Sequence, residues 1–243
     1  MSDLSGTTTL VVGASRGLGQ GIAGALAHAG SSVVAVSRTA HAPDRPDIAT
    51  EVADAADAAT PGRLLDLYRP DAIVVVAGAS PSLRPLQEHT WETFSVNWHA
   101  DVRIAFEWLR AVLRQPLRTG SRVVVVSSGA ALAGSPLSGG YAGAKATQRF
   151  ITGYARDEAE RAGLGITFTA VLPRLTPLTE LGRPAVEAYA ARAGLSEEEY
   201  RRQQGEPLTP EGAGTAMVEL LTADAGSVAP AYLLTAAGLR QLS

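Results

Sequence analysis

Short runs of aliphatic and β-branched residues alternate along this chain with longer segments of helical character. Such runs are typical of buried strands, and strands that alternate with helices pair in parallel through right-handed crossovers. The pattern therefore predicts an α/β fold with a doubly wound, mostly parallel sheet of about seven strands and helices on both faces. We expect a single domain over residues 1–243. The expected strands are residues 7–12, 32–36, 51–54, 72–76, 123–126, 166–172 and 228–235.

The composition narrows the classes of function. Hydrophobic residues make up 46% of the 243 and charged residues 19%, which indicates a folded globular protein. A net charge of −3 favours neither a nucleic acid nor a membrane partner, and the absence of cysteine removes disulfides and thiolate chemistry. The four histidines lack metal-ligand spacing, so we expect no metal. Without a signal-peptide core or a membrane-length apolar run, we expect a cytoplasmic protein.

A glycine-rich turn follows the first expected strand. Gly13, Gly17 and Gly19 have the spacing Gly-x-x-x-Gly-x-Gly and lead into an alanine-rich helix. Glycines let the backbone approach a diphosphate closely, and the free amides at the helix start bind its charge. The turn therefore predicts a dinucleotide site; the alternative is an ordinary strand-to-helix turn. The other loop residues expected to contribute are Ser15, Arg16 and Leu18.

The second expected strand ends in Ser37 and Arg38. An acidic residue at this place would bind the two ribose hydroxyls of NAD, whereas an arginine can bind a 2′-phosphate by charge and paired hydrogen bonds. Arg16 in the glycine loop could reach the same phosphate. These residues favour NADP(H); the alternative is that Arg38 is a solvated loop residue.

A hydroxyl, a phenol and an amine follow the fifth expected strand, at Ser128, Tyr141 and Lys145. Tyr141 and Lys145 lie four residues apart, so on a helix they share one face, one turn apart. A phenol titrates near pH ~10, and it works at neutral pH when a nearby cation favours its anion. Ser128 could then hydrogen-bond a carbonyl oxygen while Tyr141 protonates it. A tyrosine and a lysine at this spacing also occur by chance on many helices.

A helix is expected from Trp91 to Gln115, and Asn97 lies within it. A polar amide in the middle of a helix needs a partner or a purpose, and the alternative is an asparagine on the helix surface. Later in the chain, residues 178–206 are rich in proline and charge, with two short amphipathic helices expected at 184–193 and 196–204. This segment is expected to cover the site as a lid; the alternative is an ordinary surface insertion.

With the glycine loop, Asn97, Ser128, Tyr141 and Lys145 in this order, the chain resembles the short-chain dehydrogenase/reductase family in its single-domain, Rossmann-like form. In that family a serine precedes the Tyr-x-x-x-Lys motif by thirteen positions, as Ser128 precedes Tyr141. The resemblance implies that Tyr141 donates the proton and that Lys145 activates it and holds the nicotinamide ribose. It also implies that Ser128 orients the substrate carbonyl and that Asn97 holds a water in a proton relay.

The same resemblance extends the cofactor site to the ends of three more strands. Glu51 stands where the family commonly has an aspartate near the adenine, beside Val52. The family's Asn-Asn-Ala-Gly is replaced by a sequence without the asparagines, so we expect packing to stabilise the central sheet instead. Arg174 follows the sixth strand where a glycine is usual, and it could contact the diphosphate or an acidic substrate, or point to solvent. Further residues expected at the cofactor are Ala77, Gly78, Pro173 and Thr176.

These features lead to one functional hypothesis with two alternatives. The first is an NADP(H)-dependent oxidoreductase that transfers hydride between the nicotinamide and a small-molecule ketone, aldehyde or alcohol. The alternatives are a reductase of an imine or an activated double bond, and a dinucleotide-binding sensor or scaffold without turnover. The resemblance also implies a homodimer or homotetramer, in which Phe150, Ile151 and Tyr154 would lie at an interface.

Overall fold

An eight-stranded sheet forms the centre of the protein in the computed structural model, which describes residues 3–40, 42–43 and 45–242. The strand order is β3-β2-β1-β4-β5-β6-β7-β8, and strands β1 to β7 pair with one another in parallel. The predicted doubly wound, mostly parallel α/β fold is therefore confirmed. The strands are β1 (Thr8–Val12), β2 (Ser32–Ser37), β3 (Ala49–Val52), β4 (Ala72–Val75), β5 (Arg122–Val126), β6 (Thr167–Pro173), β7 (Ala231–Thr235) and β8 (Gly238–Leu242).

The eighth strand is an addition to the expected seven. β8 pairs antiparallel with β7, and Thr235 lies opposite Gly238 across a two-residue turn. A hairpin of this kind needs no crossover helix, so the alternation of strands and helices does not reveal it. The sequence of β8 also lacks β-branched residues, which removes the usual strand signal.

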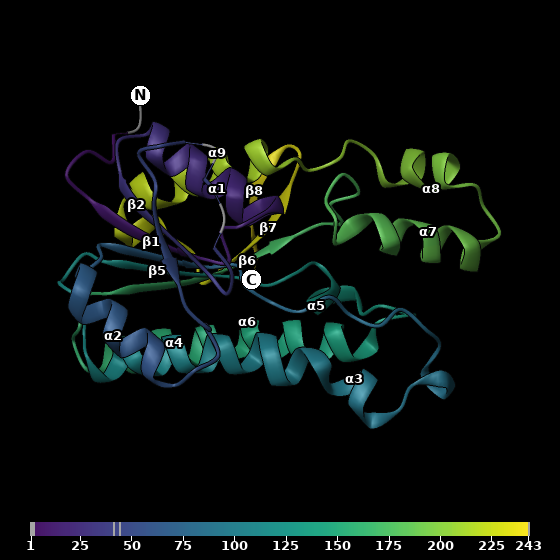
Figure 1. The fold of residues 1–243 in the computed structure, drawn as a ribbon, viewed down its shortest axis with the longest axis horizontal. Coiled ribbons are helices and arrows are strands. Elements are labelled where there is room, and N and C mark those ends of the chain that lie inside the picture. Colours follow the sequence, from purple (N-terminus) through teal and green to yellow (C-terminus); the bar gives the residue numbers. More distant parts are fainter. Residues whose placement is uncertain (1–2, 41, 44, 243) are drawn as a thin grey trace.

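Helices cover both faces of the sheet (Figure 1). One face carries α1 (Gly17–His28) and α9 (Pro210–Thr222), which pack against each other, and the other carries α2 (Ala59–Tyr68), α4 (Arg103–Arg114) and α6 (Gly139–Arg161). Each layer encloses its own hydrophobic core against the sheet. The remaining short elements are η1 (Leu86–Glu88), α3 (Trp91–Asn97), η2 (Trp98–Val102), α5 (Ala130–Ala133), α7 (Gly182–Ala193), α8 (Glu197–Gln204) and η3 (Ala225–Ser227).

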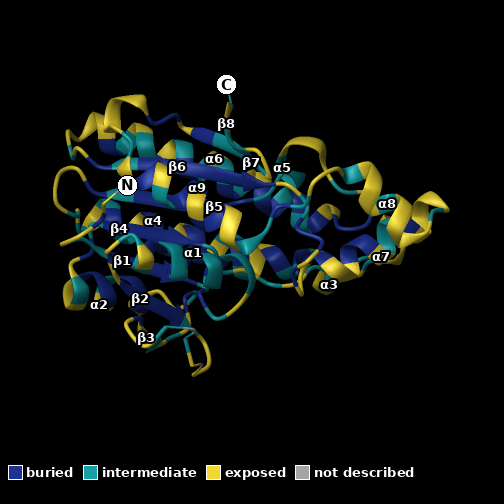
Figure 2. Ribbon diagram, turned by 90° about the horizontal axis from the view of Figure 1, so that it is seen from above, coloured by how far each residue is buried: buried dark blue, intermediate teal, exposed yellow. Residues whose placement is uncertain are grey.

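The central strands are buried on both faces, as Figure 2 shows. In β4 and β5 consecutive residues lie against opposite helix layers: Val74 and Val124 contact the core beneath α1 and α9, while Val75 and Val125 contact the other core. Strands buried on both sides need apolar residues at every position rather than at alternate ones. This requirement explains the continuous apolar runs in the sequence.

The helix expected over Trp91–Gln115 is interrupted. A π-helical turn, η2, separates α3 from α4, so the segment forms three elements rather than one. The expectation of one continuous helix was therefore wrong at its centre. A π turn adds one residue to the helical repeat and changes the direction of the side chains that follow it. Here it begins directly after Asn97.

The lid segment forms α7 and α8, close to the two helices expected there. Both helices project beyond the end of the sheet (Figure 1). The chain then returns to the sheet through α9, where the Thr209 hydroxyl accepts a hydrogen bond from the Gly212 amide at 3.0 Å as an N-cap. Across the described residues, no helix combines the length and the apolar character needed to cross a bilayer.

Candidate active site and cofactor cleft

A cleft of about 1530 Å³ opens at the carboxyl ends of the strands. The strand order reverses between β1 and β4, and doubly wound sheets bind ligands at such a reversal. The loops after β1, β2, β4, β5 and β6 line the cleft, together with α7 and α8. Its volume exceeds that of a typical small-molecule pocket, so a dinucleotide and a substrate can both be held.

The glycine loop forms one wall of this cleft. Gly13 has a positive φ of 95°, and a Cβ built there would lie 2.6 Å from the Ala77 backbone nitrogen. A Cβ at Gly19 would lie 2.0 Å from the Gly13 carbonyl oxygen. The two glycines therefore allow the turn to lie against the end of β4, and α1 begins at Gly17 with its free amides at the cleft. This arrangement fits a diphosphate group. Ser15, Arg16 and Leu18 line the cleft as well.

Arg38 and Arg16 both reach the cleft from exposed positions. Ser37 ends β2, and its hydroxyl donates to the Thr39 carbonyl at 2.7 Å. Arg16 pairs with Glu180 of the lid segment, with Nη1 and Oε2 3.0 Å apart. Both side chains of this pair are exposed, so the ion pair is weak and can exchange for a phosphate partner.

The third strand does not place its predicted residues at the cleft. Val52 is exposed and Glu51 is held by Arg63 at 2.8 Å and by the Tyr68 hydroxyl at 2.9 Å; neither residue lines the cleft. β3 ends at Val52, and the chain enters the cleft only after that. The residues that do line it there are Ala53, Asp54, Ala55 and Ala56.

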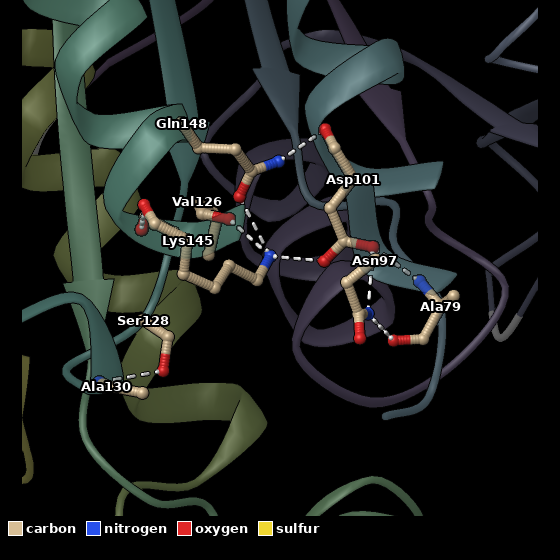
Figure 3. Close-up of polar contacts among 9 residues, drawn as sticks. Ala79, Asn97, Asp101, Val126, Ser128, Ala130, Lys145 and Gln148 are labelled. Atoms are coloured by element: carbon tan, nitrogen blue, oxygen red, sulfur yellow. Dashed lines mark hydrogen bonds and ion pairs between the residues drawn. The ribbon is translucent and has the colours of Figure 1, made fainter. Parts of the chain in front are cut away.

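Ser128, Tyr141 and Lys145 line one part of the cleft. Ser128 follows β5, and its Oγ accepts a hydrogen bond from the Ala130 amide at 3.2 Å (Figure 3). Tyr141 lies in the first turn of α6, half-buried, and Lys145 lies one turn later with Nζ 5.5 Å from the centre of the tyrosine ring. The structure therefore places the Lys145 cation beside the Tyr141 ring, as the spacing predicted, and Ser128 lines the same cleft.

The Lys145 ammonium is enclosed and paired. Its Nζ lies 3.1 Å from Asp101 Oδ2 on η2 and donates to Gln148 Oε1 at 3.0 Å (Figure 3). Burial by itself lowers the pKa of Lys145, but the charge of Asp101, the neighbouring Tyr141 and the hydrogen bond to Asp101 together raise that pKa above its ordinary value. Lys145 is therefore a cation at neutral pH.

Asn97 does not line the cleft. Its side chain is buried and donates to the Ala79 carbonyl at 2.7 Å and to Asp101 Oδ1 at 3.2 Å. The Ala79 amide in turn donates to Asp101 Oδ1 at 2.8 Å. These bonds hold the loop after β4 that lacks the family's asparagines. The expectation that packing alone stabilises this region was therefore incomplete.

Asp101 and Gln148 are not among the residues predicted from the sequence. Both are polar residues on helical segments, and both are almost fully buried. Asp101 follows Asn97 by four residues and Gln148 follows Lys145 by three, which are the spacings of one helix face. This spacing from Asn97 and Lys145 was the feature of the sequence that could have identified Asp101 and Gln148.

The end of β6 supplies the last part of the cleft. Pro173, Arg174 and Thr176 all line it; Arg174 is exposed and Thr176 is buried. Ala77 and Gly78 line it from the end of β4. From the lid, the Tyr189 hydroxyl contacts Ser135 Oγ and lies 3.1 Å from Ser138 Oγ, in the loop before α6. These contacts join α7 to the segment that carries Ser128 and Tyr141.

Comparison with known proteins agrees with this geometry. A family model described as short chain dehydrogenase matches residues 7–190. The hydroxynaphthalene reductase-like protein Arp2 of Metarhizium majus is 31% identical over 187 residues, which cover 70% of this chain and 68% of that protein. The L-xylulose reductase of Bos taurus is 32% identical over 129 residues, covering 51% of this chain and 53% of that enzyme.

Solved structures show the same fold. A dehydrogenase/reductase from Sinorhizobium meliloti 1021 has a TM-score of 0.77 at 23% identity, and the match covers 94% of this chain and 93% of that chain. A short chain dehydrogenase from Mycobacterium avium also has a TM-score of 0.77, at 20% identity, over 98% of this chain and 85% of that chain. Because the family model spans most of the chain, this protein belongs to the short-chain dehydrogenase/reductase family of oxidoreductases, whose members bind a nicotinamide dinucleotide.

Proposed function

We propose that this protein is an NADP(H)-dependent carbonyl reductase that interconverts a ketone or aldehyde and its alcohol. The observation that carries the proposal is the presence of Ser128, Tyr141 and Lys145 in the same cleft as the glycine loop. A hydroxyl that can bind a carbonyl oxygen, a phenol that can protonate it and a cation beside the phenol suit carbonyl reduction. The bound nicotinamide dinucleotide supplies the hydride.

Each residue has a distinct part in this proposal. Ser128 donates a hydrogen bond to the substrate oxygen and fixes its direction. Tyr141 gives its phenolic proton to the same oxygen as negative charge develops there. Lys145 places its positive charge beside the Tyr141 ring and stabilises the phenolate that remains. Asn97 does not line the cleft but supports its wall through hydrogen bonds to the Ala79 carbonyl and to Asp101.

The preference for NADP(H) rests on Arg38 and Arg16. Arg38 lies at the end of β2, where an acidic residue would favour NAD. Both guanidinium groups are exposed at the cleft and can bind a 2′-phosphate through paired hydrogen bonds. The adenine side is formed by residues 53–56 in place of Glu51 and Val52.

The substrate end of the cleft is formed by the loop before α6 and by the lid. It combines apolar residues such as Leu175 and Leu181 with the hydroxyls of Ser135, Ser138 and Tyr189. Relatives are named as a hydroxynaphthalene reductase-like protein and an L-xylulose reductase, and both names indicate substrates that carry hydroxyl groups. We therefore assign a hydroxylated carbonyl compound of moderate size.

The proposal includes a homo-oligomer in the cytoplasm. Phe106 on α4 and Phe150 and Tyr154 on α6 are each at least half exposed, whereas Ile151 packs against the core instead of joining them. Burying these aromatic rings against a second copy would stabilise a dimer. Light scattering should give at least twice the monomer mass, and Phe150→Asp should reduce it; a monomeric wild-type protein would contradict the oligomer.

The test is turnover of a carbonyl panel with NADPH. Hydroxylated aromatic ketones and ketoses are offered together with an imine and an activated double bond, and NADPH oxidation is followed with mass spectrometry of the products. The proposal expects an alcohol as the product. Reduction of only the imine or the double bond would instead identify the protein as a reductase of an imine or an activated double bond. Dinucleotide binding without turnover of any compound would favour the sensor.

A further inference from the structure

A buried carboxylate stands directly behind the catalytic lysine. Asp101 lies in the π turn η2, with 1% of its side chain exposed, and Lys145 lies in α6, with 6% of its side chain exposed. Their charged groups are 3.1 Å apart. Lys145 is also the only lysine in the 243 residues. The ion pair is therefore buried, and it contains the one lysine of the sequence.

Acceptors surround the Lys145 ammonium. Besides Asp101 Oδ2, it has Gln148 Oε1 at 3.0 Å and the Val126 carbonyl at 3.5 Å, as Figure 3 shows. An ammonium has three N–H donors, and three oxygen atoms of the protein lie within 3.5 Å of this one. Only one of these acceptors carries a charge. Asp101 is therefore the counter-ion, while Gln148 and Val126 complete the hydrogen bonding.

The carboxylate of Asp101 is itself held in place. Its Oδ1 accepts from the Ala79 amide at 2.8 Å and from Asn97 Nδ2 at 3.2 Å. Gln148 Nε2 donates to the Asp101 backbone carbonyl at 2.8 Å. A Cβ at Gly78 would lie 2.7 Å from Asp101 Oδ2, so a glycine is needed there for the carboxylate to take this position. Asp101 thus joins the lysine to the loop after β4, which lines the cofactor cleft.

We propose that Asp101 is a positioning residue that acts through Lys145, keeping the enclosed ammonium protonated and fixing its nitrogen at the end of β5. The inference rests on the proposed function only in assigning Lys145 to Tyr141 and, as the family resemblance implies, to the nicotinamide ribose. The protonation of Lys145 itself is a separate property that a direct measurement reports.

The physical reason is the cost of an unpaired buried charge. An enclosed lysine without a counter-ion favours its neutral form, because burial removes the solvation of the ammonium. Burial acts on Lys145 in this direction, and the charge of Asp101 and the neighbouring Tyr141 oppose it. Other titratable side chains that line the cleft from the elements around α6 are His99, Arg103 and Arg174, all exposed to solvent.

The balance between burial and the charge of Asp101 determines how the protonation of Lys145 changes with pH. With Asp101 present, the ammonium persists to a pH above the range of an ordinary lysine. With a neutral residue at this position, burial dominates and the proton leaves at lower pH. In such a variant, any activity that requires the Lys145 ammonium is lost as pH rises and recovers as pH falls. A residue with a purely structural role would lower that activity by the same factor at every pH.

The test uses lysine labelled with ¹³C at Cε and follows its NMR signal with pH in the full-length protein. Because Lys145 is the only lysine, one signal reports the ammonium directly. The wild-type midpoint should lie above that of a free lysine, about 10.4. In Asp101→Asn it should fall by about one pH unit or more. The matched control is Gln148→Met, which removes a neutral acceptor but no charge, and it should move the midpoint much less.

Three results would overturn the inference: a wild-type midpoint at or below that of free lysine, an unchanged midpoint in Asp101→Asn, or an equal shift in Gln148→Met. The titration midpoint of Lys145 in the wild-type protein tests the inference even if the Asp101→Asn variant does not fold. Stability gives a second measurement: Asp101→Leu combined with Lys145→Met should be more stable than Asp101→Leu alone, since the double variant leaves no charge unpaired. Equal stability of the two would count against the pair.

NADPH binding distinguishes this inference from the proposed function. Asp101→Asn should bind NADPH with an affinity that falls as pH rises, and the affinity should recover at lower pH. If wild-type protein and variant both fail to bind any dinucleotide, the proposed function fails, while the lysine titration still decides the role of Asp101. A pH-independent loss of binding in Asp101→Asn would contradict the inference.

Discussion

The Ser127 hydroxyl donates a hydrogen bond to the backbone carbonyl of Lys145 at 2.7 Å, which joins the end of β5 to the helix that carries Tyr141. Ser127 is buried, whereas its neighbour Ser128 lies at the cleft and is only half-buried. Two adjacent serines thus have different surroundings. Ser127 connects the strand to the helix, and Ser128 is the proposed contact for the substrate oxygen.

Substitution of the two serines should separate stability from activity. Ser127→Ala removes a buried hydrogen bond and leaves the Lys145 carbonyl without this donor, so the free energy of unfolding should fall by about 1–3 kcal/mol. Ser128→Ala should leave stability within about 0.5 kcal/mol of wild type but lower the rate of carbonyl reduction. Urea unfolding and NADPH oxidation measure the two effects. Equal loss of stability in both variants would contradict this division.

Tyr141→Phe should abolish most of the reduction while NADPH still binds. The substitution removes the proton donor and keeps the ring, and positioned proton transfer typically contributes 10²–10⁴-fold. Tyr154→Phe is the matched control, because Tyr154 lies on the same helix with an exposed ring. It should reduce the carbonyl at the wild-type rate. Similar rates in the two variants would exclude Tyr141 as the donor.

Tyr189→Phe should weaken substrate binding without affecting NADPH. The hydroxyl contacts Ser135 and Ser138 and so holds α7 to the loop before α6. Loss of two hydrogen bonds at about 0.5–1.5 kcal/mol each predicts an increase in KM of roughly tenfold or more. Tyr200→Phe is the control, because its ring packs against Tyr189 at a centroid distance of 6.3 Å and is retained. An unchanged KM in Tyr189→Phe would argue against a lid role for α7.

The stability of the protein should depend on Glu51 in acid. The hydrogen bond from Arg63 is the largest influence on the pKa of Glu51 and, despite opposition from burial, that pKa lies below its ordinary value. The pair therefore stabilises the fold fully above the pKa of an unfolded glutamate, about 4.3, and the contribution is lost as pH falls through the lower folded pKa.

Glu51→Gln measures this contribution. The difference in unfolding free energy between wild type and Glu51→Gln should be largest near neutral pH and should shrink as pH falls below about 4. Glu206→Gln, at an exposed position, is the control. A difference that stays constant with pH would contradict the assignment.

Local patterns in the sequence predicted the fold and the proximity of Tyr141 and Lys145 because local geometry determines both. Tyr141 and Lys145 share a helix face by spacing alone, and Gly13 and Gly19 stand where the turn against β4 admits no Cβ. The lid helices were also predicted from their amphipathic pattern. In each of these cases, neighbours in the sequence carry the information.

Contacts between distant segments were not predictable in this way. Asp101 meets Lys145 only because the π turn η2 packs against α6, and no local pattern indicates that turn. Val52 was assigned to the cofactor site by the family resemblance, whereas β3 runs to Val52 and the chain lines the cleft only from Ala53. The hairpin to β8 was missed because it interrupts the alternation of strands and helices.

The most direct test of the account is a titration of the purified protein with NADPH and with NADH, followed by nicotinamide fluorescence, for wild type and Arg38→Ala. Arg161→Ala, exposed at the far end of α6, is the control. We predict tight NADPH binding, weak NADH binding and a loss of at least about tenfold in NADPH affinity in Arg38→Ala alone, as expected for a lost charge-assisted phosphate contact. Failure of wild-type protein to bind either dinucleotide, or tighter binding of NADH than of NADPH, would contradict it.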